Sequence, residues 1–155
     1  MARATRFPLA ALLVAAAALA SCAPPYSMAP PASFKRFEES RQFKWITADG
    51  VMLKAREVDN YPEAPLDFWV DAMKRHMVAQ GYVAKGDRCF DTQKGRKACT
   101  VDFMLPHGAE DWVLSETLFV VGEDIVLVEA AGPFERYALV ETEIAKAVET
   151  FEPRE

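Results

Sequence analysis

The chain has 155 residues, 51% of them hydrophobic, with 18 basic and 23 acidic residues and a formal net charge of −5 at pH 7. This length is enough for one domain with a sizeable core. The acidic balance argues against nucleic acid as a partner and against electrostatic attachment to anionic lipid, because both of these attract cationic proteins.

Residues 1–21 have the pattern of a secretory signal peptide. Arg3 and Arg6 form a basic head, and residues 7–20 are almost wholly apolar. An apolar run of about 14 residues fits the core of a signal peptide and falls short of the roughly 20 residues that a membrane-spanning helix needs. Without residues 1–21 the chain keeps 134 residues, 16 basic and 23 acidic, with a net charge of −7.

The sequence Leu19-Ala20-Ser21-Cys22 closes the apolar run and resembles the lipobox of bacterial lipoproteins. The resemblance implies a diacylglyceryl group on the Cys22 thiol, cleavage before Cys22 and usually acylation of the new amine, for example by palmitate. Two or three acyl chains anchor a protein stably, whereas one chain does so only marginally. Ala23 resembles the residue that directs enterobacterial lipoproteins to the outer membrane, where the protein would face the periplasm. The alternative is an ordinary signal peptide cut nearby.

Residues 22–41 are predicted to be the lipidated N-terminus and a proline-rich linker. Four prolines lie within 11 residues, at positions 24, 25, 30 and 31. Such a chain is extended and semi-rigid, as suits a spacer between a lipid and a domain. The alternative is a peptide recognised by an aromatic groove. We expect a single folded domain over residues 42–152.

The first half of this domain is predicted to be a hairpin followed by a helix. Alternating residues from Phe43 predict a strand, Asp49-Gly50 predicts the turn, and residues 51–58 predict the return strand. A loop then leads to Pro65, which is favourable in the first turn of a helix, and Gly81 can end that helix near Gln80. Residues at helical spacing predict its buried stripe: Leu66, Trp69, Met73 and Met77.

The second half is predicted to be a long antiparallel meander and a terminal helix. Residues 82–99 start with a hairpin whose polar tip is 93–96, and the return strand runs to Leu105. Residues 106–111 are predicted to be a loop. Two further strands follow, of which 125–131 is the most apolar and is expected at the sheet centre. The last helix runs from Gly132-Pro133 to Pro153, with a predicted inner face of Phe134, Tyr137, Ala138, Glu141, Ile144, Ala145, Val148 and Phe151.

This order of elements predicts an α+β domain, an antiparallel sheet of about six or seven strands packed by two main helices. The Trp45-to-Gly50 hairpin, the helix after Pro65, the meander and the closing Ile144-to-Phe151 helix resemble the PsbP-like α/β/α sandwich over residues 42–152. That fold is found in photosystem extrinsic subunits, trafficking adaptors and bacterial lipoproteins. Most of these are binding proteins without conserved catalytic machinery, so the resemblance implies a binding role, although a fold alone does not assign a function.

Cys89 and Cys99 flank the polar tip of the predicted hairpin at equal distances from Lys94. In a symmetric hairpin the two residues face each other across the strands, close enough for a disulfide. Export to an oxidising compartment favours that bond. The alternative is two free thiols that behave as small hydrophobes. A redox-active pair is disfavoured because the C-x-x-C spacing is missing.

The chain has two histidines, His76 on the first predicted helix and His107 beside Glu110 and Asp111 in the loop. A metal site or a catalytic base built from His107, Glu110 and Asp111 is the enzymatic alternative. No metal-binding or hydrolase spacing motif supports it, so we expect no metal, no cofactor and no catalytic residue. A polar loop and a histidine at a helix edge are the simpler interpretation.

Glu116 and Glu129 interrupt two apolar strands and approach each other if the turn between the strands has two residues. Paired carboxylates support acid–base chemistry when their pKa values are pushed apart. A register change of one residue separates them. Solvent-facing positions are the preferred interpretation, since one face of an antiparallel sheet often meets water.

Together these patterns predict a lipid-anchored protein of the bacterial envelope whose domain binds or assembles with a partner and is not an enzyme. The residues predicted to carry modification are Cys22 for the lipid and Cys89 with Cys99 for the disulfide. The membrane is the first predicted partner, an envelope protein is the second, and nucleic acid is excluded by the charge. A hydrolase or metal-dependent enzyme and a purely structural envelope protein are the alternatives.

Overall fold

The computed structural model describes residues 26–37 and 44–153. The described residues form nine strands and two helices: β1 (Tyr26–Ser27), β2 (Lys35–Arg36), β3 (Lys44–Ile46), β4 (Met52–Asp59), α1 (Leu66–Ala79), β5 (Val83–Asp91), β6 (Lys97–His107), β7 (Glu110–Val121), β8 (Asp124–Pro133), α2 (Phe134–Glu149) and β9 (Glu152–Pro153).

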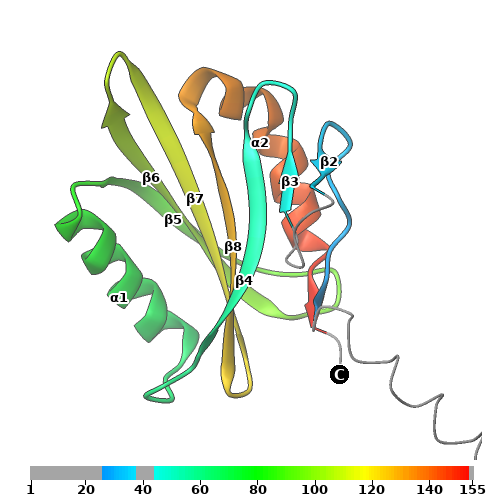
Figure 1. Ribbon diagram of the computed structural model, residues 1–155. Coiled ribbons are helices and arrows are strands. Elements are labelled where there is room, and N and C mark those ends of the chain that lie inside the picture. The colour runs from blue at the N-terminus through cyan, green and yellow to red at the C-terminus, as the bar shows by residue number, and fades with distance from the viewer. Residues whose placement is uncertain (1–25, 38–43, 154–155) are drawn as a thin grey trace, which may run out of the picture.

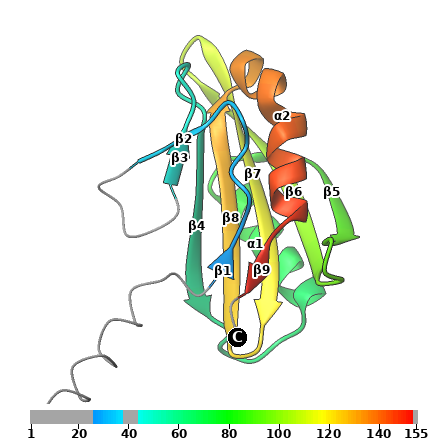
Figure 2. The same cartoon turned by 90° about the vertical axis from the view of Figure 1, so that its right-hand side faces the viewer.

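Seven strands form one antiparallel sheet in the order β2-β3-β4-β8-β7-β6-β5. The helices lie on opposite faces of it, α1 against β5, β6 and β7 and α2 against β7 and β8. Figure 1 shows the strands between the two helices, and Figure 2 shows α2 in front of the sheet with α1 behind it. The predicted α+β class, with an antiparallel sheet packed by two helices, is confirmed.

The central position predicted for residues 125–131 is confirmed, because β8 is the fourth of the seven strands. Hydrophobic side chains cover both of its faces. Val126, Val128 and Ala130 point into the core beneath α2, and Ile125 and Leu127 point toward α1. A strand buried on both faces carries a nearly continuous apolar run, which is why the sequence signals it clearly.

The first helix begins after Pro65, whose extended backbone serves as the N-cap, and ends at Ala79. Gly81 follows with a φ of +92°, a conformation that favours glycine and lets the chain turn back toward β5. Val70 is the one buried residue of α1. The predicted stripe of Leu66, Trp69, Met73 and Met77 faces the sheet but is only partly buried. This helix therefore covers the sheet loosely.

The second helix packs more tightly, with Tyr137, Ile144, Ala147 and Val148 buried. Phe151, just beyond it, is fully buried and stacks on Phe119 at 3.9 Å between ring centroids. Three residues predicted for the inner face, Phe134, Ala138 and Glu141, are exposed instead. Their prediction is wrong because the helix turns a narrower stripe toward β7 and β8 than the sequence pattern suggests.

The predicted linker over residues 22–41 is wrong for its described part, residues 26–37. Tyr26, Met28 and Phe34 are at most 7% exposed and belong to the core beneath α2. The Tyr26 hydroxyl donates a hydrogen bond of 2.9 Å to the carbonyl of Ala55, and β1 pairs with β9 at the other end of the chain. The proline content of this segment favours the prediction of a linker, because prolines disfavour helices and long strands. Three apolar side chains can nevertheless be buried from an extended segment that forms no long strand. The folded domain thus begins by Tyr26.

The predicted loop at residues 106–111 is also wrong. β6 continues to His107 and β7 starts at Glu110, so a tight Gly108–Ala109 turn joins two long strands. The other predicted turns are confirmed: Gly50 has a φ of +88°, and β7 pairs with β8 so that only Gly122 and Glu123 lie between the last partners. Among residues 26–37 and 44–153, no helix is long and apolar enough to span a membrane.

Candidate functional site

Two glutamates lie side by side on the sheet face that α1 partly covers. The two-residue turn between β7 and β8 sets the register, which places Glu116 directly opposite Glu129. Side chains alternate along a strand, so Glu116 shares its face with Leu114 and Leu118. Glu116 is 5% exposed and Glu129 is 8% exposed. The solvent-facing interpretation of these residues is therefore wrong, because α1 shields this face from water.

The two carboxylates differ in their partners. Lys54 Nζ lies 2.9 Å from Glu129 Oε2, and Arg56 Nε donates to the same oxygen at 3.1 Å. Both cations come from β4, which pairs with β8 on the side opposite β7. Glu116 Oε2 is buried, and no group within the described part of the chain hydrogen-bonds to it. A buried acceptor without a partner costs about 1–3 kcal/mol, so it is rare in a folded protein.

Burial, together with the negative charge of Glu129 and a hydrogen bond with that carboxylate, raises the pKa of Glu116 to about 7, against the opposing effect of Arg56 and Lys54. The rise follows from the low polarity around the carboxyl, which disfavours its charged form. The carboxyl therefore changes its protonation state close to neutral pH. A group of this kind is a candidate for function, although structural pairs show such shifts as well.

A cleft of about 510 Å³ opens between α1 and the sheet above these glutamates. Its floor comes from β4, β7 and β8, and its roof comes from α1 and from Tyr82 in the turn that leads to β5. The side chains that line it are mostly apolar, with a few polar ones: Arg56, Val58, Asp59, Trp69, Ala72, Met73, His76, Met77, Tyr82, Leu114, Glu116, Leu118, Ile125, Leu127 and Glu129. Small-molecule sites have volumes of roughly 300–1,000 Å³ and this mixture of lining groups.

Asn60 holds one wall of the cleft in place. Its Oδ1 accepts hydrogen bonds from Trp69 Nε1 at 2.7 Å and from the backbone N–H of Ala64 at 3.1 Å. Its backbone N–H donates to the carbonyl of Glu123 in the β7–β8 turn at 2.7 Å. Asn60 thus fixes the Trp69 indole relative to the turn that sets the glutamate register. The sequence carries no spacing signal for this role.

The structure does not bring Glu110 and Asp111 together as a catalytic pair. They are neighbours in β7, so they point to opposite faces of the strand. Both are exposed, and they border a hollow that residues 133–136 also line. The His107 side chain lies outside the described part of the structure. His76 is exposed at the edge of α1, and the described residues hold no group of three or more potential metal ligands.

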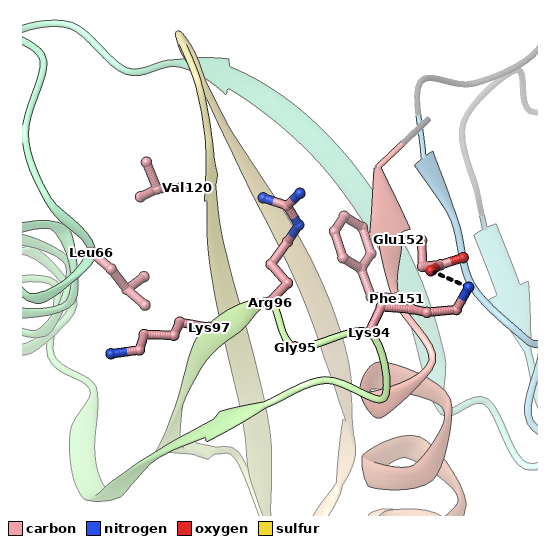
Figure 3. A pocket seen from close by; sticks show the side chains of 8 residues that line it. All are labelled: Leu66, Lys94, Gly95, Arg96, Lys97, Val120, Phe151 and Glu152. Carbon is pink, nitrogen blue, oxygen red and sulfur yellow. Dashed lines mark ion pairs between the residues drawn. The ribbon is translucent and has the colours of Figure 1, made fainter. Parts of the chain in front are cut away.

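A second hollow, of about 750 Å³, lies near the tip of the β5–β6 hairpin. Figure 3 shows Arg96 extending between Leu66 and Phe151, while Lys94 turns toward Glu152. Lys94 Nζ and Glu152 Oε1 are 3.1 Å apart, and the lysine side chain is 71% exposed. Exposed ion pairs of this kind contribute little energy and do not by themselves define a site. The cleft beneath α1 is the stronger candidate because it holds a buried carboxyl, that of Glu116, whose Oε2 has no hydrogen-bond partner among the described residues.

The disulfide between Cys89 and Cys99 is present, and the two residues pair directly across β5 and β6. It lies on the α1 side of the sheet, close to Leu66 at the start of that helix. Cys22, the residue predicted to carry the lipid, lies outside the described residues.

The comparisons with known proteins establish the fold. The chain is similar to the solution structure of the PsbP protein of the cyanobacterium Synechocystis sp. PCC 6803, with a TM-score of 0.61 and 11% identity over 83% of this chain and 86% of that chain. It has the PsbP-like fold. A similar structure with the same coverage of this chain is that of PA94, a Pseudomonas aeruginosa protein of unknown function, with a TM-score of 0.63, 15% identity and 98% of that chain covered.

A scan against protein-family models finds no match, and no curated protein matches the sequence. At 11% and 15% identity, the two structural similarities establish the PsbP-like fold and carry no activity with them. The glutamate pair must therefore be interpreted from its own chemistry.

Proposed function

We propose that this protein is a lipid-anchored lipoprotein of the bacterial envelope, and that its PsbP-like domain is a non-enzymatic binding module with its site in the cleft beneath α1. The observation that carries the binding role is the Glu116 carboxyl. It is buried in a cleft of about 510 Å³ and has an oxygen that no described residue satisfies. A bound ligand or partner would supply the missing donor, which would offset the cost of leaving that oxygen unpaired.

The anchoring part of the proposal rests on Leu19-Ala20-Ser21-Cys22 after a basic head and an apolar run. Because the folded domain begins by Tyr26, only three residues separate it from Cys22. Four residues span at most about 14 Å when fully extended. We therefore infer that the lipid holds the body of the domain close to the membrane surface, most simply the periplasmic face of the outer membrane.

The anchor is tested by mass spectrometry of the mature N-terminus after expression in a Gram-negative host. We expect cleavage before Cys22 and the added mass of a diacylglyceryl group with a further acyl chain. The Cys22→Ser variant is expected to lose the lipid and to leave the membrane fraction. Cleavage elsewhere, or an unmodified Cys22 thiol, contradicts the proposal.

The binding site is tested with the neutral fluorescent probe N-phenyl-1-naphthylamine and the soluble domain that starts at residue 23. We expect the wild-type protein to bind one equivalent with enhanced emission. Ala72→Trp, which places an indole in the cleft, should abolish the enhancement, and Ala138→Trp on the exposed face of α2 should not. Both variants are first checked for cooperative unfolding. Equal binding by both folded variants, or none by the wild type, contradicts the assignment of the cleft.

A further inference from the structure

The charges around the cleft are unequally shared between the two glutamates. Lys54 and Arg56 both contact Oε2 of Glu129, so this carboxylate has two cationic partners. Glu116 lies opposite Glu129 in the register, and its Oε2 has no hydrogen-bond partner in the described structure. The unmet requirement of the cleft is therefore one hydrogen-bond donor at Glu116, and a positively charged donor meets it best.

The walls around Glu116 suit the rest of such a ligand. Leu114 and Leu118 flank it on β7, and Met73 and Met77 face them from α1. These side chains favour a hydrocarbon body, and methionine adapts to many shapes. Trp69 and Tyr82 add aromatic rings to the same lining, and the faces of such rings attract ammonium groups.

We propose that the cleft selects small amphiphilic amines, with the ammonium group donating to Glu116 and the hydrocarbon body lying against the methionine and leucine walls. This inference deepens the proposed binding function and rests on it. A ligand with a carboxylate or phosphate group meets two carboxyls at the floor of the cleft. The cations that would attract that anion, Lys54 and Arg56, are already held by Glu129.

The test compares three ligands that share one apolar body: octylamine, octanol and octanoate. Each displaces N-phenyl-1-naphthylamine from the soluble domain, and isothermal titration calorimetry measures its binding directly. At pH 8.5 we expect octylamine to bind at least tenfold more tightly than octanol and octanoate to bind more weakly than octanol. Glu116→Gln should reduce the preference for octylamine over octanol to less than threefold. Glu141→Gln, on the exposed face of α2, is the matched control and should keep it.

The pH dependence provides a second measurement. An alkylammonium group keeps its charge from pH 5.5 to 8.5, because its pKa lies near the value of about 10.4 for lysine. Glu116 gains its charge in this range, since burial raises its pKa to about 7. Octylamine should therefore bind at least fivefold more tightly at pH 8.5 than at pH 5.5, whereas octanol should not change. The other charged or titratable groups that face this carboxyl across the cleft are Glu129 on β8, Lys54, Arg56 and Asp59 on β4, and His76 and Tyr82 from the roof.

The His76→Asn variant tests whether His76 causes the pH dependence of octylamine binding. This variant should retain that dependence, whereas Glu116→Gln should remove it. The inference is overturned if octanol or octanoate binds as tightly as octylamine, or if Glu116→Gln keeps the full preference. In that case the proposed binding function still stands, because the cleft binds a ligand. If neither the probe nor any octyl compound binds the folded wild type, the proposed function fails together with the inference.

Discussion

The two faces of the central sheet are closed in different ways. On one face α2 covers β7 and β8, and residues 26–37 together with β9 add Tyr26, Met28, Phe34 and Phe151 to the same core. On the other face α1 covers β5, β6 and β7. On this second face, the β4 residues Met52 and Lys54 remain exposed. Figure 2 shows β1 and β9 beside α2 on the first face.

This difference explains where the cleft lies. The first face has a helix and an additional segment over it, and together they bury Tyr26, Met28, Phe34, Tyr137, Ile144 and Phe151 in one core. The second face has a single helix whose stripe is only partly buried, and a cleft of about 510 Å³ remains beside it. The first face is thus the more deeply buried, and the second leaves room for a ligand above a buried carboxyl. A stable scaffold that supports a less well-packed binding region is a common division in proteins.

The largest effect should come from the tightly packed face. Phe151→Ala removes a fully buried ring that stacks on Phe119 and lies 5.7 Å from Tyr26 between centroids. We expect the free energy of unfolding in urea to fall by about 3–5 kcal/mol. Phe68→Ala on α1, where the ring is 50% exposed, should cost less than about 1 kcal/mol. Equal losses at the two sites would contradict the proposed division between the faces.

The next effect tests the buried carboxyl on the looser face. Burial raises the pKa of Glu116 to about 7 from an ordinary value of 4.5, so folding disfavours its charged form. The unfolded chain then loses its proton at lower pH than the native protein, and the native state loses stability as pH rises from about 4.5 to about 7. The free energy of unfolding of Glu116→Gln, relative to that of wild type, should therefore increase by on the order of 2–3 kcal/mol from pH 5 to pH 8.

Urea unfolding of both proteins at pH 5 and pH 8 measures this difference, and other titrating groups cancel in the comparison. Glu141→Gln should show no such trend, because its side chain is exposed. A difference between Glu116→Gln and wild type that is independent of pH would show that Glu116 is ionised throughout, and it would contradict the raised pKa.

The sequence predicts the hairpins and the central strand well, because these depend on local patterns. Asp49-Gly50 and Gly122-Glu123 form turns where expected, and Cys89 faces Cys99 across a hairpin symmetric about Lys94. Turn chemistry and period-two alternation act over a few residues, so one sequence is sufficient to recognise them.

The sequence does not predict which features meet across the sheet. Alternation places Glu116 on the same face as Leu114 and Leu118, which is a signal of burial, but whether a helix covers that face depends on tertiary packing. The burial of Tyr26, Met28 and Phe34 is hidden for the same reason, because their partners lie in β4, α2 and β9. The unpaired oxygen and the Asn60–Trp69 bond are visible only in three dimensions.

The disulfide should have an effect of similar size on the α1 face. The double variant Cys89→Ala/Cys99→Ala opens a loop with a sequence separation of 10 residues. In the chain-entropy model, this loop closure contributes about 2–3 kcal/mol to the free energy of unfolding. Urea unfolding under non-reducing conditions measures the loss. The same treatment of wild type with a reducing agent should give a similar loss, and no change in either case would contradict a stabilising role.

The smallest effect concerns the segment that closes the tightly packed face. Tyr26→Phe keeps the buried ring and removes only the hydroxyl that donates to the Ala55 carbonyl at 2.9 Å. A hydrogen bond of this kind contributes about 1 kcal/mol, so we expect a loss of that size in urea unfolding. A protein that starts at residue 38 lacks this hydrogen bond together with the buried Tyr26, Met28 and Phe34 side chains, and it should be less stable than the Tyr26→Phe variant. Because Tyr26 follows Cys22 by only four residues, a loss close to zero in the full domain would also contradict the short distance that we infer between the lipid and the folded body.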